Sequence, residues 1–229
     1  MMTSMQAHDR LIVAADLSTR DEILALHDEL AGVAGVLKIG LQAFIANGPG
    51  LVRELVQRRA RVFLDLKLHD IPNTVQSAVA EAEALGAFML TVHASGGPAM
   101  LRAARSQKTL VLAVTVLTSL DAAQLAQVGL GADPEATAVR LAQLAHESGL
   151  RGVVASPLEI SAIREACGSA LTIVTPGIRP SGFDAADQRR TMTPAQAIRE
   201  GADYIVVGRP ITNAKSRREA ALRIIDEMI

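Results

Sequence analysis

Two carboxylates and an ammonium group lie close together in one stretch of the chain, residues 61–74, RVFLDLKLHDIPNT. Asp65 and Lys67 stand two apart in an apolar run that reads as a strand, and Asp70 follows just beyond it. Side chains alternate between the faces of a strand, so Phe63, Asp65 and Lys67 should share one face. Charges that point into a protein interior are costly unless they are paired or functional. The stretch therefore indicates either a structural ion pair or a catalytic site.

Polar residues also follow the other apolar runs of the chain. If those runs are parallel strands, their carboxyl ends meet at one rim, where the active sites of α/β barrels lie. His93 has no adjacent residue to orient it, so we expect a structural histidine rather than a catalytic acid. The residues expected at this rim, besides 65, 67 and 70, are Asp16, Lys38, His93, Thr118, Ser119, Arg179, Gln188, Gly208 and Arg209. This gathering favours the catalytic interpretation over an isolated ion pair.

Three carboxylates and two ammonium groups at one rim, Asp16, Lys38, Asp65, Lys67 and Asp70, can form a network in which opposite charges alternate. Two unit charges about 4 Å apart at an effective dielectric near 20 interact by about 4 kcal/mol. A lysine held between aspartates should therefore stay protonated and act as an acid. Carboxylates also suit Mg²⁺, which makes a metal site the rival interpretation. The interleaved lysines would repel a divalent cation, so we expect no metal.

The last two apolar runs predict a phosphate site. Barrels often bind phosphate with the loops after strands seven and eight and with a short helix. Here Arg209 offers a planar donor fork next to Gly208, and a helix is expected to open near Thr212. The long loop after residues 171–177 adds Arg179 and Gln188. Its length predicts a functional loop, and its charge pattern indicates a lid that closes on the anion. A solvated basic loop remains the alternative.

Short aliphatic runs alternate with helical patterns along the whole chain. Near-continuous aliphatic runs are typical of strands that are buried on both faces. Eight such runs are present, at residues 11–16, 35–40, 61–67, 88–94, 109–117, 152–156, 171–177 and 203–208. Eight strands that alternate with helices predict a (β/α)₈ TIM barrel, and a doubly wound open sheet is the alternative. The barrel is favoured because no G-x-G-x-x-G follows the first run.

Helix starts can be read between these runs. Thr19 with Glu22 has the spacing of a capping box. Asp133 stands before a proline, as an N-cap residue does before proline at the first helical position. Thr193 also precedes a proline, and Gln196 occupies the box position. These signals support helices between the strands.

The composition limits the function classes. The 229 residues carry no linker or low-complexity segment, so residues 1–229 are predicted to form a single domain. A net charge of -1, one Tyr and no Trp argue against a nucleic-acid binder. No apolar run reaches the roughly 18 residues that span a bilayer, and the polar N-terminus lacks the core of a signal peptide. Cys167 is the only cysteine and is interpreted as an apolar filler. We expect a cytoplasmic protein with no membrane partner.

Several motifs together resemble orotidine 5'-phosphate decarboxylase. They are D-x-K-x-x-D-I-P-N-T at 65–74, V-L-T-S at 116–119, T-P-G-I-R-P at 175–180, Gln188 and V-G-R-P at 207–210. The resemblance extends from the first strand to the last and is similar to the bacterial branch of the family. It implies a homodimeric lyase of pyrimidine synthesis that forms UMP from orotidine 5'-monophosphate, with no cofactor and no metal.

The resemblance also implies residue roles. Lys67 would protonate the carbanion left when carbon dioxide departs from the pyrimidine, and Asp65 and Asp70 would hold Lys67 and flank the departing carboxylate. The remaining roles that it implies concern substrate binding. Asp16 and Lys38 would contact the ribose hydroxyls, Thr118 and Ser119 the base, and Arg179, Gln188, Gly208 and Arg209 the phosphate, with a further substrate contact by Pro180. Asp70, Ile71 and Thr74 would be supplied across the dimer interface. Each active site would then be shared between two subunits.

Two rival functions stay open. Related barrel decarboxylases or aldolases that act on sugar phosphates share D-x-K-x-x-D, but use a metal and depart from D-I-P-N-T. Lys38 and residues 72–74 favour the nucleotide enzyme over these relatives. A non-catalytic sensor of phosphorylated ligands would keep Gly208 and Arg209, but would be free to lose Asp65, Lys67 or Asp70. The presence of the whole set favours an enzyme.

Overall fold

Runs of branched aliphatic residues form eight parallel strands that close into a barrel in chain order. The computed structural model describes residues 5–180 and 191–229. Each predicted run overlaps one strand, and the predicted TIM barrel is confirmed. The strands are β1 Leu11–Ala14, β2 Val36–Gly40, β3 Val62–Leu68, β4 Met89–His93, β5 Leu110–Val114, β6 Gly152–Val154, β7 Thr172–Thr175 and β8 Tyr204–Val207. The alternative of an open sheet is wrong, because β1 pairs with both β2 and β8.

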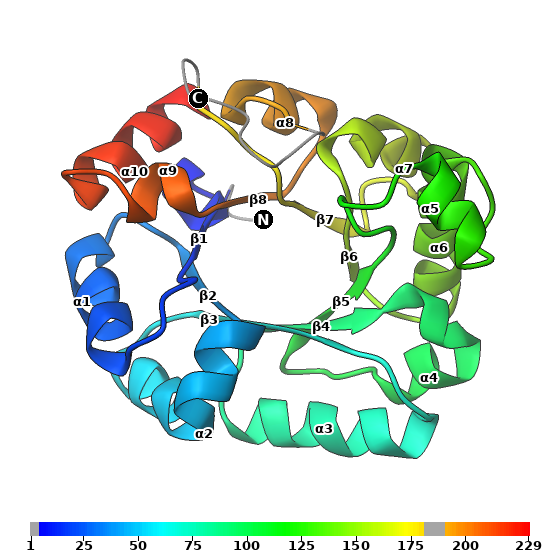
Figure 1. Cartoon of the computed structure of the whole chain (residues 1–229), viewed down its shortest axis with the longest axis horizontal. Coiled ribbons are helices and arrows are strands. Elements are labelled where there is room, and N and C mark those ends of the chain that lie inside the picture. The colour runs from blue at the N-terminus through cyan, green and yellow to red at the C-terminus, as the bar shows by residue number, and fades with distance from the viewer. Residues whose placement is uncertain (1–4, 181–190) are drawn as a thin grey trace.

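Helices surround the ring of strands (Figure 1). Their bounds in the described residues are α1 Arg20–Leu30, α2 Leu41–Gln57, α3 Pro72–Ala84, α4 Gly97–Ala103, α5 Ala122–Gln127, α6 Pro134–Glu147, α7 Ile160–Cys167, α8 Pro194–Glu200, α9 Arg209–Thr212 and α10 Arg217–Glu227, with short 3-10 turns η1 Ala7–Arg10, η2 Ala94–Gly96 and η3 Pro157–Glu159. The helix α2 is kinked at Gly48, which has a φ of 64° and precedes Pro49. No described helix is long and apolar enough to cross a membrane.

The predicted helix starts are confirmed. Thr19 and Thr193 form capping boxes with the residues three positions on, and the Asp133 side chain accepts from the Ala136 N–H. These caps satisfy backbone donors at the N-terminal ends of the helices. Those ends lie on the side of the barrel where the strands end, which we call the mouth. The helix expected near Thr212 is misplaced, because α9 begins at Arg209, directly after the N-cap residue Gly208, and already ends at Thr212.

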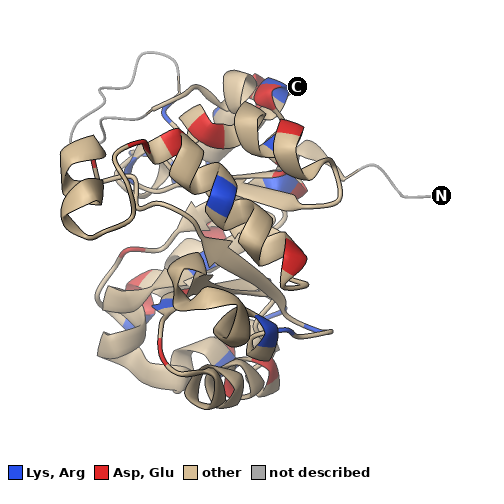
Figure 2. Cartoon of the chain, turned by 90° about the vertical axis from the view of Figure 1, so that its right-hand side faces the viewer, with Lys and Arg blue, Asp and Glu red and all other residues tan. Residues whose placement is uncertain are grey.

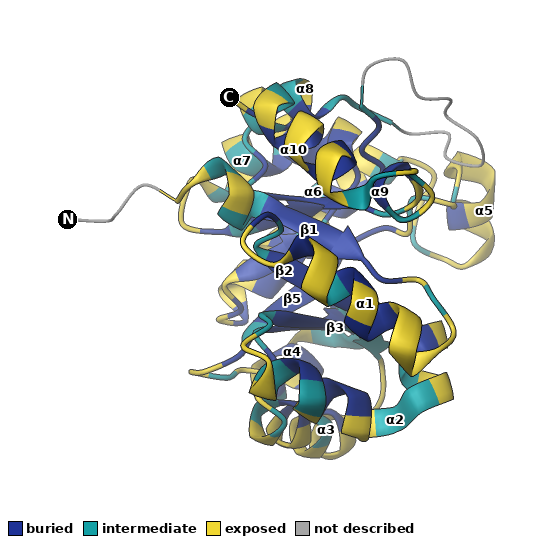
Figure 3. Ribbon diagram, turned by 90° about the vertical axis from the view of Figure 1, so that its left-hand side faces the viewer, coloured by how far each residue is buried: buried dark blue, intermediate teal, exposed yellow. Residues whose placement is uncertain are grey.

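The strands bury both faces, which explains their near-continuous apolar sequences. On β1, Leu11 and Val13 belong to the layer between the sheet and the helices, whereas Ile12 and Ala14 point into the barrel. Figure 3 shows buried strands, and helices that have one buried face and one exposed face. Charged residues of both signs are distributed over the outer helices in Figure 2. The barrel interior is thus filled by side chains, and only its ends can hold a ligand.

Candidate active site

Strand β3 departs from regular pairing with its neighbour β4. Pairing stops after Leu64 and resumes at Leu68, so three residues of β3, 65–67, lie opposite Thr91 alone. Within this bulge Lys67 has a φ of 52°, in the left-handed region that costs a residue with a Cβ about 1–2 kcal/mol. Strain and bulges of this kind cluster at functional sites. The local backbone therefore marks the same stretch that the charges marked.

Four charged side chains alternate in sign across the ends of three consecutive strands. The Lys38 Nζ on β2 lies 3.0 Å from an Asp16 oxygen beyond β1 and 3.7 Å from Oδ2 of Asp65 on β3. The Lys67 Nζ donates to the other Asp65 oxygen, Oδ1, at 2.8 Å. Asp65 thus lies between two ammonium groups, and Lys38 lies between two carboxylates. Four of the five residues predicted to form the network contact one another in this way, and Asp70 does not join them.

Burial of the network increases from Asp16 to its centre. The Asp16 side chain is 59% exposed, whereas Lys38 and Asp65 keep only 11% and 16% of their side-chain surface exposed. Burial by itself raises the pKa of the Asp65 carboxyl. The charges of Lys38 and Lys67 and the hydrogen bonds from Lys67 and Thr91 outweigh this effect, so the pKa of Asp65 is lowered overall. Asp65 is therefore a carboxylate at neutral pH.

Two cavities meet at Lys38 and Asp65. The smaller, about 180 Å³, is mostly apolar, and both Lys67 and Thr118 face it. Its apolar lining comes from strands around the ring and the loops that follow them: Phe63, Val114, Val116, Leu117, Val154, Ala155, Pro176 and Val206. The larger, about 470 Å³, has a more polar lining and extends to Arg179, Gly208 and Arg209. The mouth therefore offers an apolar compartment and a cationic one, joined at the charge network.

The cationic compartment lies where β8 ends. Gly208 is the N-cap of the one-turn helix α9, and Arg209 is its first residue. A Cβ at Gly208 would lie 3.5 Å from the Ala14 Cβ and 4.0 Å from an Asp16 oxygen, which are ordinary contacts. There is room for a side chain there, but the Gly208 backbone, with φ -110° and ψ -104°, lies outside the regions that residues with a Cβ favour. Glycine therefore suits this position for its backbone conformation.

Some predicted site residues are not brought into the network. The Asp70 carboxylate accepts from the Ile71 N–H at 2.6 Å and is exposed, as are Ile71 and Thr74. Ser119 does not line the smaller cavity, although Thr118 does. Pro180 does not line the cavity that contains Arg179 and Arg209. It lies instead in a surface groove beside Pro210 and α10. Gln188 lies outside the described residues.

Thr91 contacts the charge network but was not predicted from the sequence. Its hydroxyl contacts both Asp65 and the backbone of Lys67. A polar residue in an otherwise apolar run, on the face that Met89 and His93 share, was the available signal. His93 itself lies 5.5 Å from His69, ring to ring, and its pKa is lowered by burial and by the neighbouring charges of His69 and Lys67. Its neutral form agrees with a structural role.

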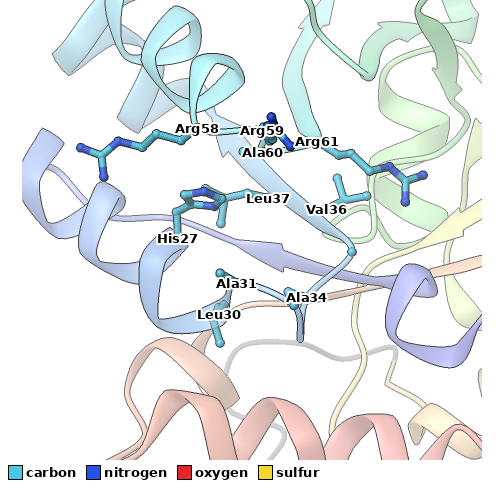
Figure 4. A pocket seen from close by; sticks show the side chains of 12 residues that line it. His27, Leu30, Ala31, Ala34, Val36, Leu37, Arg58, Arg59, Ala60 and Arg61 are labelled. Atoms are coloured by element: carbon cyan, nitrogen blue, oxygen red, sulfur yellow. The ribbon is translucent and has the colours of Figure 1, made fainter.

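A further cavity, about 270 Å³, lies at the opposite end of the barrel (Figure 4). Arg58, Arg59, Arg61 and His27 line it, which gives it the look of an anion site. Figure 4 shows the guanidinium groups of Arg58 and Arg61 pointing away from the cavity, to either side. Arg58 is paired with two carboxylates and Arg61 with one. Most of its cationic charge is therefore already matched by the protein.

The acidic groups of the mouth do not form a metal-binding set. Within residues 5–180 and 191–229, no group of three His, Cys, Asp or Glu side chains is gathered closely enough to hold an ion. Asp16 and Asp65 stand on either side of the Lys38 ammonium group instead. The geometry is suited to binding an organic anion and to proton transfer.

Known proteins are similar to this chain in sequence and in fold. Residues 9–224 match the family described as Orotidine 5'-phosphate decarboxylase / HUMPS family. The orotidine 5'-phosphate decarboxylases of Moorella thermoacetica and Heliobacterium modesticaldum are 50% and 49% identical to the chain, over 99% and 98% of it and 95% and 97% of their own lengths. The crystal structure of orotidine 5'-phosphate decarboxylase from Lactobacillus acidophilus has a TM-score of 0.84 at 34% identity, over 95% of this chain and 98% of that one.

Proposed function

The chain belongs to the orotidine 5'-phosphate decarboxylase family, and from that premise we propose how its residues convert orotidine 5'-monophosphate to UMP and carbon dioxide. Family membership makes the protein a carboxy-lyase of pyrimidine synthesis. We further propose that residues 1–229 act as one decarboxylase domain, in the cytoplasm and as a homodimer. The observation that carries the residue roles is the meeting of an apolar and a cationic cavity at the alternating charge network.

The two compartments match the two ends of a nucleotide. The pyrimidine ring occupies the apolar cavity beside Lys67 and Thr118, with Ser119 nearby. The phosphate occupies the cationic cavity, where Arg209 supplies a fork of donors and Gly208 allows close approach. Arg179 lines the same cavity, and we assign Gln188 and Pro180 to this end as well. The ribose then lies over the junction, where its hydroxyls bind Asp16 and Lys38.

The reaction breaks the bond between the ring carbon C6 and the substrate carboxylate. The electron pair of that bond stays on C6 as a carbanion, and carbon dioxide leaves. Lys67 donates a proton from Nζ to C6, which gives UMP and a neutral amine that water then reprotonates. A fixed ammonium group stabilises charge as it develops, which is usually the largest catalytic contribution. Asp65 orients the Lys67 ammonium group through their 2.8 Å hydrogen bond.

Repulsion between Asp65 and the bound substrate also lowers the barrier to decarboxylation in this proposal. Asp65 is an ionised, largely buried carboxylate, so the substrate carboxylate would meet a like charge beside it. Loss of carbon dioxide removes that repulsion. Lys38 offsets part of the repulsion while the substrate is bound, because it contacts Asp65 on the side away from Lys67.

The residues that follow β3 support the shared active site. Asp70, Ile71 and Thr74 are exposed at the start of α3, directly after the strand that carries Lys67. Ile71 keeps 66% of its surface exposed, which is high for an isoleucine next to a catalytic strand. We assign these three residues to the neighbouring subunit's site, where Asp70 would complete the network around that subunit's Lys67.

Loss of orotidine 5'-monophosphate absorbance with the purified protein in EDTA tests the activity. We expect full turnover in EDTA, because the network contains ammonium groups where a metal would stand. No turnover with this substrate would contradict the proposed function. Turnover that EDTA abolishes would favour the metal-dependent sugar-phosphate relatives instead.

A further inference from the structure

Thr91 is a fully buried polar side chain on β4, and it lies opposite the bulge of β3. Ladder hydrogen bonds between the strands are interrupted where residues 65–67 oppose this one residue. A buried backbone N–H left without an acceptor would be costly. The Lys67 N–H instead donates to Oγ1 of Thr91 at 2.9 Å. The threonine hydroxyl thus replaces the missing ladder bond at the strained residue.

The same hydroxyl also reaches the catalytic carboxylate. Oγ1 of Thr91 donates to Oδ1 of Asp65 at 3.0 Å, and this oxygen also accepts from the Lys67 Nζ at 2.8 Å. The three hydrogen bonds form a closed ring that runs from the backbone of Lys67 through Thr91 and Asp65 to the ammonium group of the same lysine. Backbone and side-chain ends of Lys67 are therefore fixed by one threonine.

We propose that Thr91 is a positioning residue for decarboxylation, which holds Lys67 in its left-handed conformation and aims the Asp65 carboxylate at the Lys67 ammonium group. This inference rests on the proposed function. Thr91 lines neither cavity of the mouth, so it acts through Asp65 and Lys67 rather than on the substrate. Removal of its hydroxyl should lower kcat and not raise KM, because no contact with the substrate is lost.

Another buried threonine provides a matched control. Thr109 is as buried as Thr91, and its hydroxyl donates to the Ala87 carbonyl at 2.9 Å, at the opposite end of the barrel. A change of Thr109 to valine removes one buried hydroxyl bond of similar length, without touching the charge network. It therefore measures what a purely structural hydroxyl is worth for stability and for turnover.

The test compares Thr91→Val, Thr91→Ser and Thr109→Val with the wild type by thermal unfolding, kcat and KM for orotidine 5'-monophosphate. We expect Thr91→Val to lower kcat about 10- to 100-fold with KM nearly unchanged, because the Lys67 N–H loses its acceptor and the charged Asp65 carboxylate loses a donor. Thr91→Ser keeps the oxygen and should restore kcat to within about threefold of the wild type. Thr109→Val should lose thermal stability and keep its kcat.

Three results would overturn the inference: a folded Thr91→Val with wild-type kcat, a Thr91→Ser as impaired as Thr91→Val, or an equal loss of kcat in Thr109→Val. If Thr91→Val does not fold, Thr91→Cys, with a weaker donor and acceptor of similar size, takes its place under the same expectations. An inactive wild type would contradict the proposed function, whereas an active wild type with a fully active Thr91→Val would contradict only the role of Thr91.

Discussion

The two ends of the barrel hold similar side chains, but their charges contact different partners. At the end where the strands begin, arginines donate to backbone carbonyls. Arg164 reaches the carbonyls of Gly168, Leu171 and Gly201, all within 2.8 Å, and also pairs with Asp203. At the mouth, the two lysines of the network contact carboxylates only, and they border cavities. The cations therefore stabilise the fold at the end where the strands begin, whereas at the mouth they face cavities that can hold a ligand.

Helix direction explains the difference. A helix that connects one strand to the next starts near the mouth and runs back, so its free carbonyls and the negative end of its dipole lie where the strands begin. Cations there are stabilised by the fold and need no ligand. At the mouth the helix N-termini already favour anions, so cations add to a positive field that only carboxylates or an anionic substrate can balance. A cluster of arginines is therefore weak evidence for a site, whereas lysines that face a cavity at the mouth are strong evidence.

Removing one cation from each end tests whether the cations at the two ends differ in their effect on catalysis. We expect Lys67→Ala to lower kcat by about 10⁴-fold or more, since it removes both the proton donor and the charge that stabilises the carbanion. Arg61→Ala, at the other end, removes a partner of Asp9 and a cation over the Phe88 ring, and should keep kcat within about threefold. Steady-state kinetics on both variants decides. Near-normal turnover by Lys67→Ala would contradict the role of proton donor.

A second pair of variants concerns substrate affinity. Arg209→Ala should raise KM for orotidine 5'-monophosphate about 10- to 100-fold, because the phosphate loses charge-assisted hydrogen bonds. Arg58→Ala, which removes an arginine paired with Asp28 and Glu54, should leave KM unchanged. Equal changes of KM in the two variants would show that the two ends do not differ as proposed.

The opposite end should respond in stability rather than in activity. Arg164→Ala removes the arginine donor to three carbonyls and the ion pair with Asp203, whose carboxylate keeps only the Ile173 N–H, so we expect the free energy of unfolding to drop by about 2 kcal/mol. The kcat/KM of the folded variant should match the wild type. Urea unfolding and kinetics on the same preparation measure both quantities, and a loss of kcat/KM without a loss of stability would refute the assignment.

The smallest expected effect is the pH dependence of stability at the mouth. Because the pKa of Asp65 is lowered in the folded protein, its ionised form stabilises the fold above the ordinary aspartate pKa of about 3.9. That stabilisation is lost as the pH falls through the lowered pKa. The difference in unfolding free energy between the wild type and Asp65→Asn should therefore shrink at acidic pH. A difference that stays constant down to acid unfolding would show that Asp65 is not held ionised.

Much of the fold followed from local patterns. The eight aliphatic runs and the caps at Thr19, Asp133 and Thr193 depend on neighbours in sequence, and the structure confirms them. The alternating charges of β1 to β3 were also predictable, because strand ends of a parallel barrel meet at one rim. Lys38, for instance, could be placed beside Asp65 from the order of the strands alone.

The rest depended on contacts between distant residues. The bulge in β3 and the left-handed Lys67 arise from a register shift against β4, which no pattern within residues 61–74 encodes. Thr91 could not be linked to Asp65 without that shift. Asp70 was predicted beside Lys67, but within one described chain its carboxylate binds the next backbone N–H, so its proposed role depends on a second subunit.

A crystal structure with bound UMP tests the central claim most directly, that the charge network at the mouth is the catalytic centre. We expect the base in the apolar cavity, with C6 about 3 Å from the Lys67 Nζ, and the phosphate beside Gly208 and Arg209. UMP bound with its phosphate among Arg58, Arg59 and Arg61, or with C6 turned away from Lys67, would contradict it.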